Sequence, residues 1–87
     1  MRKFRFSIDN GTTFTVHAPK LCRYKAFLTA KGDDEVYTSV ADIVSDNDEK
    51  KTIDKDYISN EFTVDDLSRF YKEFPAWLSS EKEADPN

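Results

Sequence analysis

Apolar and polar side chains alternate through the first part of the chain. Phe and β-branched residues recur at every second position of residues 4–8 and 12–16, on either side of Asp9-Asn10-Gly11. This period of two is typical of strands, so we expect a β-hairpin. A two-residue turn would place Phe14 on the face opposite Phe6. A three-residue loop pairs these two side chains and gives its glycine the left-handed position that such a loop needs, so we predict the second register.

From residue 19 onward the apolar period changes to that of a helix. Pro19 suits a first helical position, and Gly32 is typical of a helix end. Asp33 then lies where it could cap a second helix, and Asp54 where it could cap a short third helix. Residues 45–52 between these helices are polar and indicate an exposed loop. The apolar stripes of the first two helices are Leu21, Tyr24, Phe27 and Leu28, and Val36, Tyr37, Val40, Ile43 and Val44.

The last predicted helix begins with a capping pattern. Thr63 is followed three residues later by Asp66, as in a capping box. Pro75 lies within the apolar stripe, where it removes a backbone donor and clashes with the carbonyl four residues back. We expect a kink rather than a break, because the stripe continues in phase. The stripe consists of Leu67, Phe70, Tyr71, Phe74, Trp77 and Leu78.

These patterns together predict an α+β fold. A two-stranded antiparallel hairpin is marginal alone, so we expect about four α-helices to pack on its apolar face. Residues 1–78 would form a single domain. Residues 79–87 are polar, and we expect them to fray as a disordered tail.

Composition narrows the class of protein. The 87 residues carry 13 basic and 17 acidic side chains, a net charge of −4, with one Cys and one His. These counts exclude a disulfide and a zinc site built from Cys and His. No apolar run approaches the ~18 residues of a membrane helix, so we expect a soluble, intracellular protein without a membrane partner. Charge is uneven: residues 1–25 have a net charge of 6 − 1 = +5, and residues 26–87 of 7 − 16 = −9.

The residues do not indicate catalysis, a cofactor or a metal. His17 ends a predicted strand and has no Gly-rich turn nearby for an oxyanion site. Cys22 lies among basic residues that could activate a thiol, but we interpret it as a small buried or half-buried thiol. A calcium loop starting at Asp46 fails, because Lys50 and Lys51 occupy its fifth and sixth positions. We therefore expect no catalytic, cofactor-binding or metal-binding residues, and no enzyme.

The aromatic end of the last predicted helix allows two interpretations. Tyr71, Phe74, Trp77 and Leu78 share one stripe and are followed at once by the polar tail. This patch either covers the end of the hydrophobic core or forms a contact surface for another protein. We take these four residues as the candidate protein-binding site.

The order of these features resembles that of the small tail assembly chaperones of long-tailed bacteriophages and prophages. The similarity covers residues 2–78 and includes Phe-Arg-Phe-Ser-Ile (4–8), Thr-Val-His-Ala-Pro-Lys-Leu (15–21) and Phe-Thr-Val-Asp-Asp-Leu (62–67). It implies a non-enzymatic protein of the bacterial host cytoplasm that binds the largely helical tape-measure protein. Such chaperones keep this client from aggregating until tube subunits assemble around it, and they are absent from the virion. They tend to self-associate, so the resemblance also implies that this protein could form a homo-oligomer.

The residues are also compatible with two other functions. A small acidic regulator, carried by a phage or plasmid, could bind a basic host protein through carboxylates gathered on one face. A nucleic-acid-binding hairpin could use the basic N-terminal segment, with an affinity that falls steeply as salt is added. The aromatic residues are predicted on the face opposite Arg5, whereas a stacking surface needs them beside the cations, so we expect no nucleic-acid partner.

Overall fold

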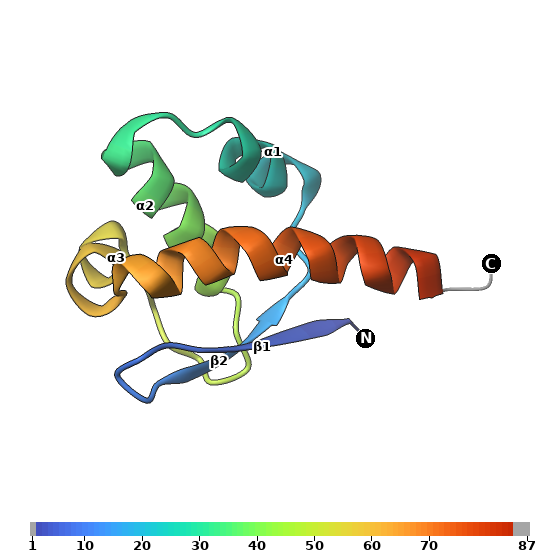
Figure 1. Cartoon of the computed structure of the whole chain (residues 1–87), viewed down its shortest axis with the longest axis horizontal. Coiled ribbons are helices and arrows are strands. Elements are labelled where there is room, and N and C mark those ends of the chain that lie inside the picture. Colours follow the sequence, from blue (N-terminus) through green and yellow to red (C-terminus); the bar gives the residue numbers. More distant parts are fainter. Residues whose placement is uncertain (1, 85–87) are drawn as a thin grey trace.

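The computed structural model describes the backbone of residues 2–84 and the side chains of residues 2–80. Strands β1 (Lys3–Ser7) and β2 (Thr13–His17) form an antiparallel hairpin. Four helices follow within the described residues: α1 (Leu21–Thr29), α2 (Gly32–Val44), α3 (Lys55–Glu61) and α4 (Val64–Ala84). The hairpin lies on one side of α4, and α1 and α2 lie on the other (Figure 1). The predicted α+β fold is confirmed.

The hairpin has the register derived from the three-residue loop. Phe4 pairs with Val16 and Phe6 with Phe14, so these four side chains lie on one face and are buried. Gly11 has φ +96°, a conformation in which an L side chain is strained. The Gly11 N–H donates to the carbonyl oxygen of Ile8 at 2.9 Å and closes the loop.

Phenylalanine rings form the centre of the core. They come from both strands, α1 and α4, and the fully buried ones include Phe6, Phe14, Phe27, Phe70 and Phe74. The Phe27 ring meets that of Phe70 edge-on, with the ring centroids 5.6 Å apart. Edge-to-face pairs of this kind add attraction beyond the burial of apolar area. In the described part of the chain, no helix combines the length and the hydropathy that crossing a membrane requires.

Two helix starts differ from prediction. Helix α1 begins after Pro19, which lies outside the helix, and Lys20 occupies the N-cap position. Asp33 does not cap α2, because that helix begins at Gly32 and its N-cap, Lys31, lies two residues before Asp33. The carboxylate of Glu35 instead accepts the Lys31 N–H at 3.0 Å. An acid placed in the first turn thus reaches back to the free backbone donor, as in half of a capping box.

Helix α4 continues through Pro75 without a break. Its backbone also remains helical to Ala84, beyond residue 79, where we expected fraying to begin. Residues 85–87 of the predicted tail lie outside the described residues.

A buried carboxylate fixes the start of α4 against the hairpin loop. The Thr63 N–H donates to Asp66 Oδ2 at 2.9 Å, and the Asp66 N–H donates to Thr63 Oγ1 at 3.0 Å, which completes the predicted capping box. The Asp9 N–H donates to both oxygens of the same carboxylate, at 3.1 Å to Oδ1 and at 3.2 Å to Oδ2. Arg69 Nη2 donates to Oδ1 at 2.7 Å. Burial alone would raise the pKa of Asp66. The Thr63 and Asp9 N–H groups and the Arg69 guanidinium outweigh it and lower that pKa.

Residues 45–52 form the predicted loop, with six of the eight residues exposed, but the loop also packs along the outer edge of β2. The Asp48 N–H donates to the Thr15 carbonyl oxygen at 3.0 Å. Asn47 is only 7% exposed, and its amide donates to the Val44 carbonyl oxygen at 2.7 Å. The hydrogen bonds of the Asn47 side chain thus hold the segment in place, and the segment covers the outer edge of β2.

Candidate protein-binding surface

The four residues of the predicted contact patch separate between core and surface. Phe74 is fully buried, and its ring stacks on that of Phe70 with the centroids 4.9 Å apart. It lies 5.4 Å from the ring of Phe4 on β1. Phe74 therefore belongs to the core and offers no surface to a partner in this structure.

Tyr71 is half-buried and fills the space between α1 and α4. Its ring stacks on Phe27 with the centroids 4.3 Å apart, and its hydroxyl donates to the Phe27 carbonyl oxygen at 3.4 Å. Burial raises the pKa of the Tyr71 phenol, although a hydrogen bond with the Ser39 hydroxyl acts in the opposite direction. Tyr71 joins two helices rather than forming a free surface.

Trp77 is half-buried and closes the core at the N-terminal end of β1. Its ring centroid lies 5.4 Å from that of Phe4 and 5.6 Å from that of Phe74. The Arg2 guanidinium lies 5.1 Å from the ring centroid, in cation–π geometry, and Arg2 Nη2 donates to the Leu78 carbonyl oxygen at 2.9 Å. Trp77 is thus covered on one side by Arg2 and on another by the core.

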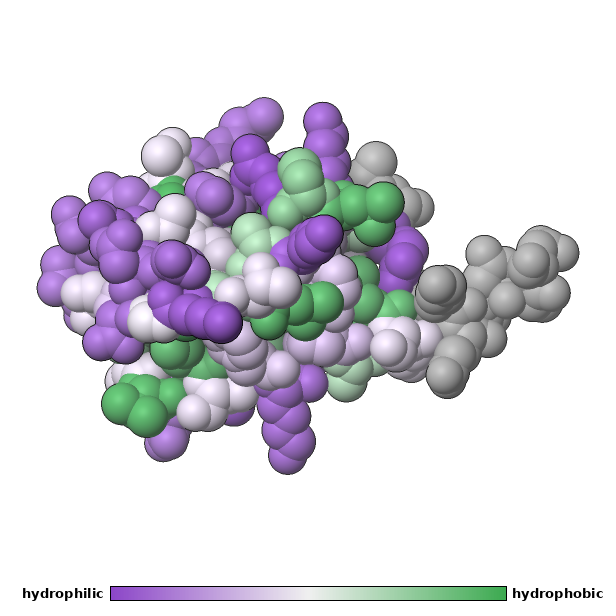
Figure 2. All heavy atoms as spheres, turned by 90° about the horizontal axis from the view of Figure 1, so that it is seen from above, coloured by the Kyte–Doolittle hydropathy of each residue, from purple (hydrophilic) through white to green (hydrophobic). Residues whose placement is uncertain are grey.

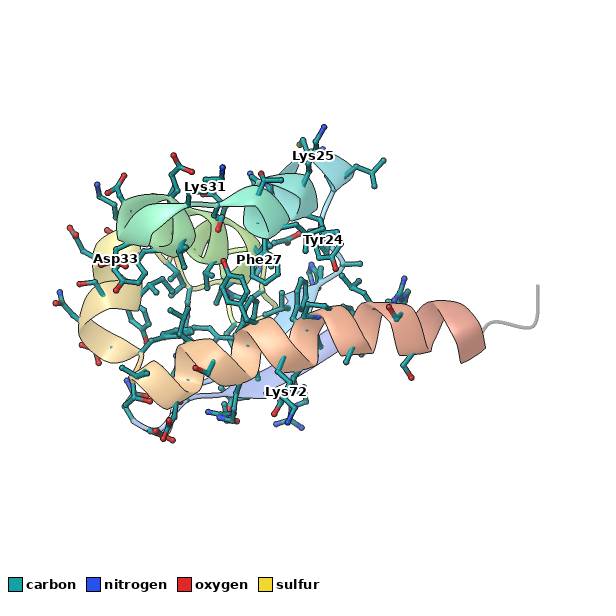
Figure 3. The ribbon with its side chains drawn as sticks, turned by 45° about the horizontal axis from the view of Figure 1, so that its top comes forward. Tyr24, Lys25, Phe27, Lys31, Asp33 and Lys72 are labelled. Atoms are coloured by element: carbon teal, nitrogen blue, oxygen red, sulfur yellow. The ribbon has the colours of Figure 1, made fainter. Side chains whose placement is uncertain are left out.

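Leu78 lines a groove of about 330 Å³ between the start of α1 and the second half of α4. Figure 3 shows Tyr24 and Phe27 pointing from α1 towards α4, which places Tyr24 at the inner side of this groove. Leu21 lies at the groove with 88% of its surface exposed. We call this feature the α1–α4 groove, and it is lined by Arg2, Ala18, Pro19, Leu21, Tyr24, Leu78 and Ser79.

The sequence indicated Leu21 as part of an inward-facing stripe, and that expectation is wrong. Leu21 and Leu28 are separated by seven residues and therefore share one face of α1, yet they are 88% and 58% exposed. Tyr24 and Phe27 are the residues of this stripe that pack inward. Figure 2 shows separate apolar patches on the face seen from above, with hydrophilic side chains between them. The sequence carried no signal for this difference, because four apolar residues at helical spacing describe a buried or an exposed stripe equally well.

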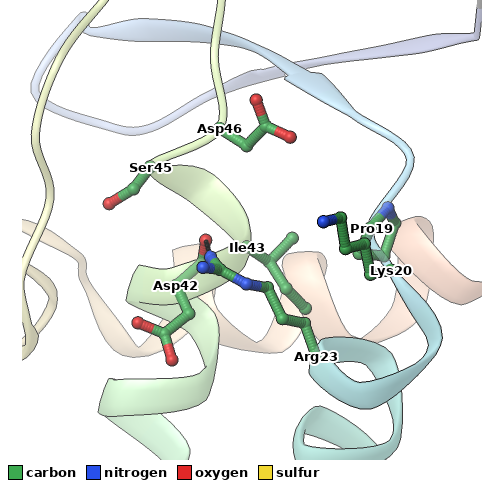
Figure 4. Close-up of a pocket in the computed structure, with 7 residues that line it drawn as sticks. All are labelled: Pro19, Lys20, Arg23, Asp42, Ile43, Ser45 and Asp46. Carbon is green, nitrogen blue, oxygen red and sulfur yellow. Dashed lines mark hydrogen bonds between the residues drawn. The ribbon is translucent and has the colours of Figure 1, made fainter.

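A second cleft, of about 400 Å³, lies on the polar side of the α1 start. Figure 4 shows the Arg23 guanidinium against Asp42 of α2, and its Nη1 donates to the Asp42 carbonyl oxygen at 2.8 Å. The lining also includes Lys20 and Asp46. Two cationic and two anionic side chains balance in this cleft, so its charge does not favour an anionic ligand.

His17 is held between two carboxylates of the segment 45–52. Its Nδ1 lies 2.9 Å from Asp46 Oδ1, and its Nε2 lies 2.6 Å from Asp48 Oδ1. Lys3 Nζ contacts the other oxygen of Asp48 at 2.8 Å. The hydrogen bond to Asp48 raises the pKa of His17, burial opposes it, and Asp46 adds to the increase. Both ring nitrogens are hydrogen-bonded, so neither is available as a general base in this structure. The carboxylates of the segment also offset part of the positive charge on the hairpin face.

Other reactive groups do not converge on a site. Cys22 is an exposed residue of α1 with a free thiol, so the expectation of a buried or half-buried thiol is wrong. Across the described residues, His, Cys, Asp and Glu side chains form no group of three or more that could hold a metal ion. The α1–α4 groove, in contrast, brings a leucine that is 88% exposed beside Tyr24 and Leu78.

Comparison of the chain with protein-family models, with curated proteins and with solved structures finds no match.

Proposed function

We propose that this protein is a binding protein without catalytic activity that acts as a phage tail assembly chaperone. It would hold a largely helical tape-measure protein soluble until the tail tube assembles. The observation that carries the proposal is the α1–α4 groove, where Leu21 is 88% exposed beside Tyr24 and Leu78. An amphipathic helix laid in this groove would bury these apolar groups, as helix-in-groove contacts do. The sequence resemblance supplies the class of client.

Charge supports the same role. Residues 26–87 have a net charge of 7 − 16 = −9, and most of these acids lie away from the groove lining. A strongly charged body keeps a complex soluble even when its client is apolar. The protein would thus cover an apolar stripe of the client and expose carboxylates in its place.

Coexpression with the tape-measure protein encoded beside the gene tests the proposal. We expect the client in the soluble fraction with the wild-type protein and in the pellet without it. Burying one leucine is worth about 2 kcal/mol, so Leu21→Glu should weaken binding at least ~10-fold and return the client to the pellet. Val64→Glu is the matched control, because Val64 is 83% exposed and begins α4, 14 residues before Leu78 of the groove.

Two outcomes would contradict the proposal in different ways. If the client is equally insoluble with and without the wild-type protein, the chaperone function is wrong. If Leu21→Glu and Val64→Glu both keep the client soluble, the function stands but the α1–α4 groove is not the surface that performs it.

One observation favours the acidic regulator as a second candidate. The start of α2, all of α3 and the start of α4 lie at one end of the molecule (Figure 1). Exposed acids gather on these segments: Asp33, Asp34, Glu35, Asp56, Glu61 and Asp65. Binding to a basic host protein that weakens steeply from low to physiological salt would favour this function. Capture of an apolar client that is insensitive to salt would favour the chaperone.

A further inference from the structure

The two edges of the β1–β2 hairpin are covered to different extents. Successive residues of a strand direct their N–H and C=O groups to alternate edges. Thr15 directs both groups outward from β2, since its N–H donates to Glu49 Oε1 at 2.7 Å and its carbonyl accepts from Asp48 at 3.0 Å. Thr15 is paired with Arg5, so the N–H and C=O of Arg5 point outward from β1.

The edge of β2 is closed by an acidic segment of the chain itself. The His17 N–H donates to the Asp46 carbonyl oxygen at 3.0 Å, and Val16 forms an isolated bridge with Asn47. The carboxylate of Glu49 accepts both the N–H and the hydroxyl of Thr15, each at 2.7 Å. A short segment with three carboxylates, Asp46-Asn47-Asp48-Glu49, therefore already bonds to this edge of the hairpin through one bridge residue and the Glu49 side chain.

The edge of β1 has no such cover among the described residues. Its outward-facing residues Lys3, Arg5 and Ser7 are exposed. The Ser7 carbonyl oxygen accepts Arg69 Nη2 at 2.9 Å, whereas the backbone groups of Lys3 and Arg5 bond to no described residue outside the hairpin. Lys3 contacts Asp48, but the Arg5 guanidinium contacts no described carboxylate.

We propose that the outer edge of β1, at Lys3 and Arg5, is a docking site for an extended acidic segment of a partner protein. The segment would add to the hairpin as a third strand and pair with the outward-facing backbone groups. The residue opposite Arg5 would lie on the same solvent-facing side of the sheet. A carboxylate at that position would meet a guanidinium that contacts no carboxylate among the described residues. On β2, the bridge between Val16 and Asn47 already places carboxylates beside an outer edge of the same hairpin.

A second copy of this chain does not suit the same edge. Antiparallel pairing of two β1 strands about Arg5 would place one Arg5 opposite the other, and pairing about Lys3 would place two lysines opposite each other. Like charges directly opposite one another are destabilising, and lysine on an open edge is a known protection against self-association. The occupant is therefore an acidic segment of a different protein.

Amide hydrogen exchange of the wild-type protein tests the geometry first. We expect the amides of Thr15 and His17 to be protected by the acidic segment, and that of Phe6 by the hairpin. The Arg5 amide should exchange at nearly the rate of an unstructured peptide. Protection of Arg5 equal to that of Phe6 would show that this edge is already paired, and would overturn the proposal.

A titration followed by nuclear magnetic resonance tests the partner. The probes are the capped peptides Thr-Val-Glu-Val-Thr and Thr-Val-Lys-Val-Thr at low salt. We expect the glutamate peptide to shift the amides of Lys3 and Arg5, with a Kd about two- to fivefold lower than that of the lysine peptide, the range of one cross-strand ion pair. Arg5→Glu should reverse this preference. Lys25→Glu, the same charge change on an exposed residue of α1, should leave it unchanged.

Three results would overturn the proposal: no shift at β1 with either peptide, equal affinity for both peptides, or the same effect of Arg5→Glu and Lys25→Glu. None of these measurements involves the tape-measure protein. They therefore test the β1 edge independently of the chaperone function.

Discussion

Replacing the buried carboxylate of Asp66 should destabilise the whole domain. Asp66 is 0% exposed and accepts the N–H groups of Thr63 and Asp9 and the guanidinium of Arg69. In Asp66→Ala, two backbone donors lose their partner, at about 1 kcal/mol each in these partly buried positions. Loss of the Arg69 contact adds about 1 kcal/mol. The sum is about 3 kcal/mol, a large part of the roughly 4–13 kcal/mol expected for a domain of this length.

Urea unfolding followed by circular dichroism at pH 7 measures this loss directly. A change of ~3 kcal/mol corresponds to a fall of roughly 12–24 °C in Tm for a domain of this size. Asp65→Ala is the matched control, because Asp65 is an exposed neighbour in the same first turn of α4. It loses only its interaction with the helix dipole, about 0.3–1 kcal/mol. If the two variants unfold within ~1 kcal/mol of each other, the buried network does not hold α4 to the hairpin loop.

The pH dependence of the wild type provides a second measurement at Asp66. The folded state lowers the pKa of Asp66 below its ordinary value of 3.8. The carboxylate therefore contributes its stability above the pKa of the unfolded chain and loses it as the pH falls towards the folded pKa. Asp66→Asn keeps the size of the side chain but cannot ionise, so its stability should fall less steeply in acid than that of the wild type. An equally steep fall in both proteins would assign acid unfolding to other carboxylates.

Three further predictions concern the rest of the fold. The folded state raises the pKa of His17, so its stabilising effect is complete below the ordinary value of 6.5 and is lost as the pH rises through the folded pKa. Urea unfolding should show this loss in the wild type and not in His17→Gln. Phe27→Ala should cost about 3–5 kcal/mol in chemical denaturation, because Phe27 is 1% exposed among four aromatic rings. Arg2→Ala should cost about 1 kcal/mol and shift the Trp77 fluorescence to longer wavelength, since the guanidinium over the indole is replaced by water. An unchanged emission spectrum would contradict that contact.

The features that the sequence predicted well depend on local chemistry. The register of the hairpin follows from the length of one loop and from the face that phenylalanines must share, and both are visible within 18 residues. The caps at Asp54 and Thr63 depend on side chains that bond to the backbone three residues away. Such short-range rules leave few alternatives, so these elements could be assigned without the structure.

The features that the sequence missed depend on distant partners. Residues 45–52 are polar, and only the structure shows that Asn47 turns back to the chain while Asp48 reaches Thr15, 33 residues earlier. The exposure of Leu21 likewise depends on where α1 lies relative to α4, which helical spacing does not specify. The four residues taken as a contact patch divide between core and groove for the same reason.

The position of the α1–α4 groove decides which substitutions can report on binding. Phe74 and Trp77 pack against Phe4, so their removal would lower stability, and a loss of binding would follow from unfolding alone. Leu21 has almost its full surface in solvent, and a change there removes little from the core. A Leu21→Glu protein that melts like the wild type but fails to hold its client would assign the loss to the surface. The same loss in Phe74→Ala would carry no such meaning, although Phe74 belongs to the aromatic stripe that first suggested the site.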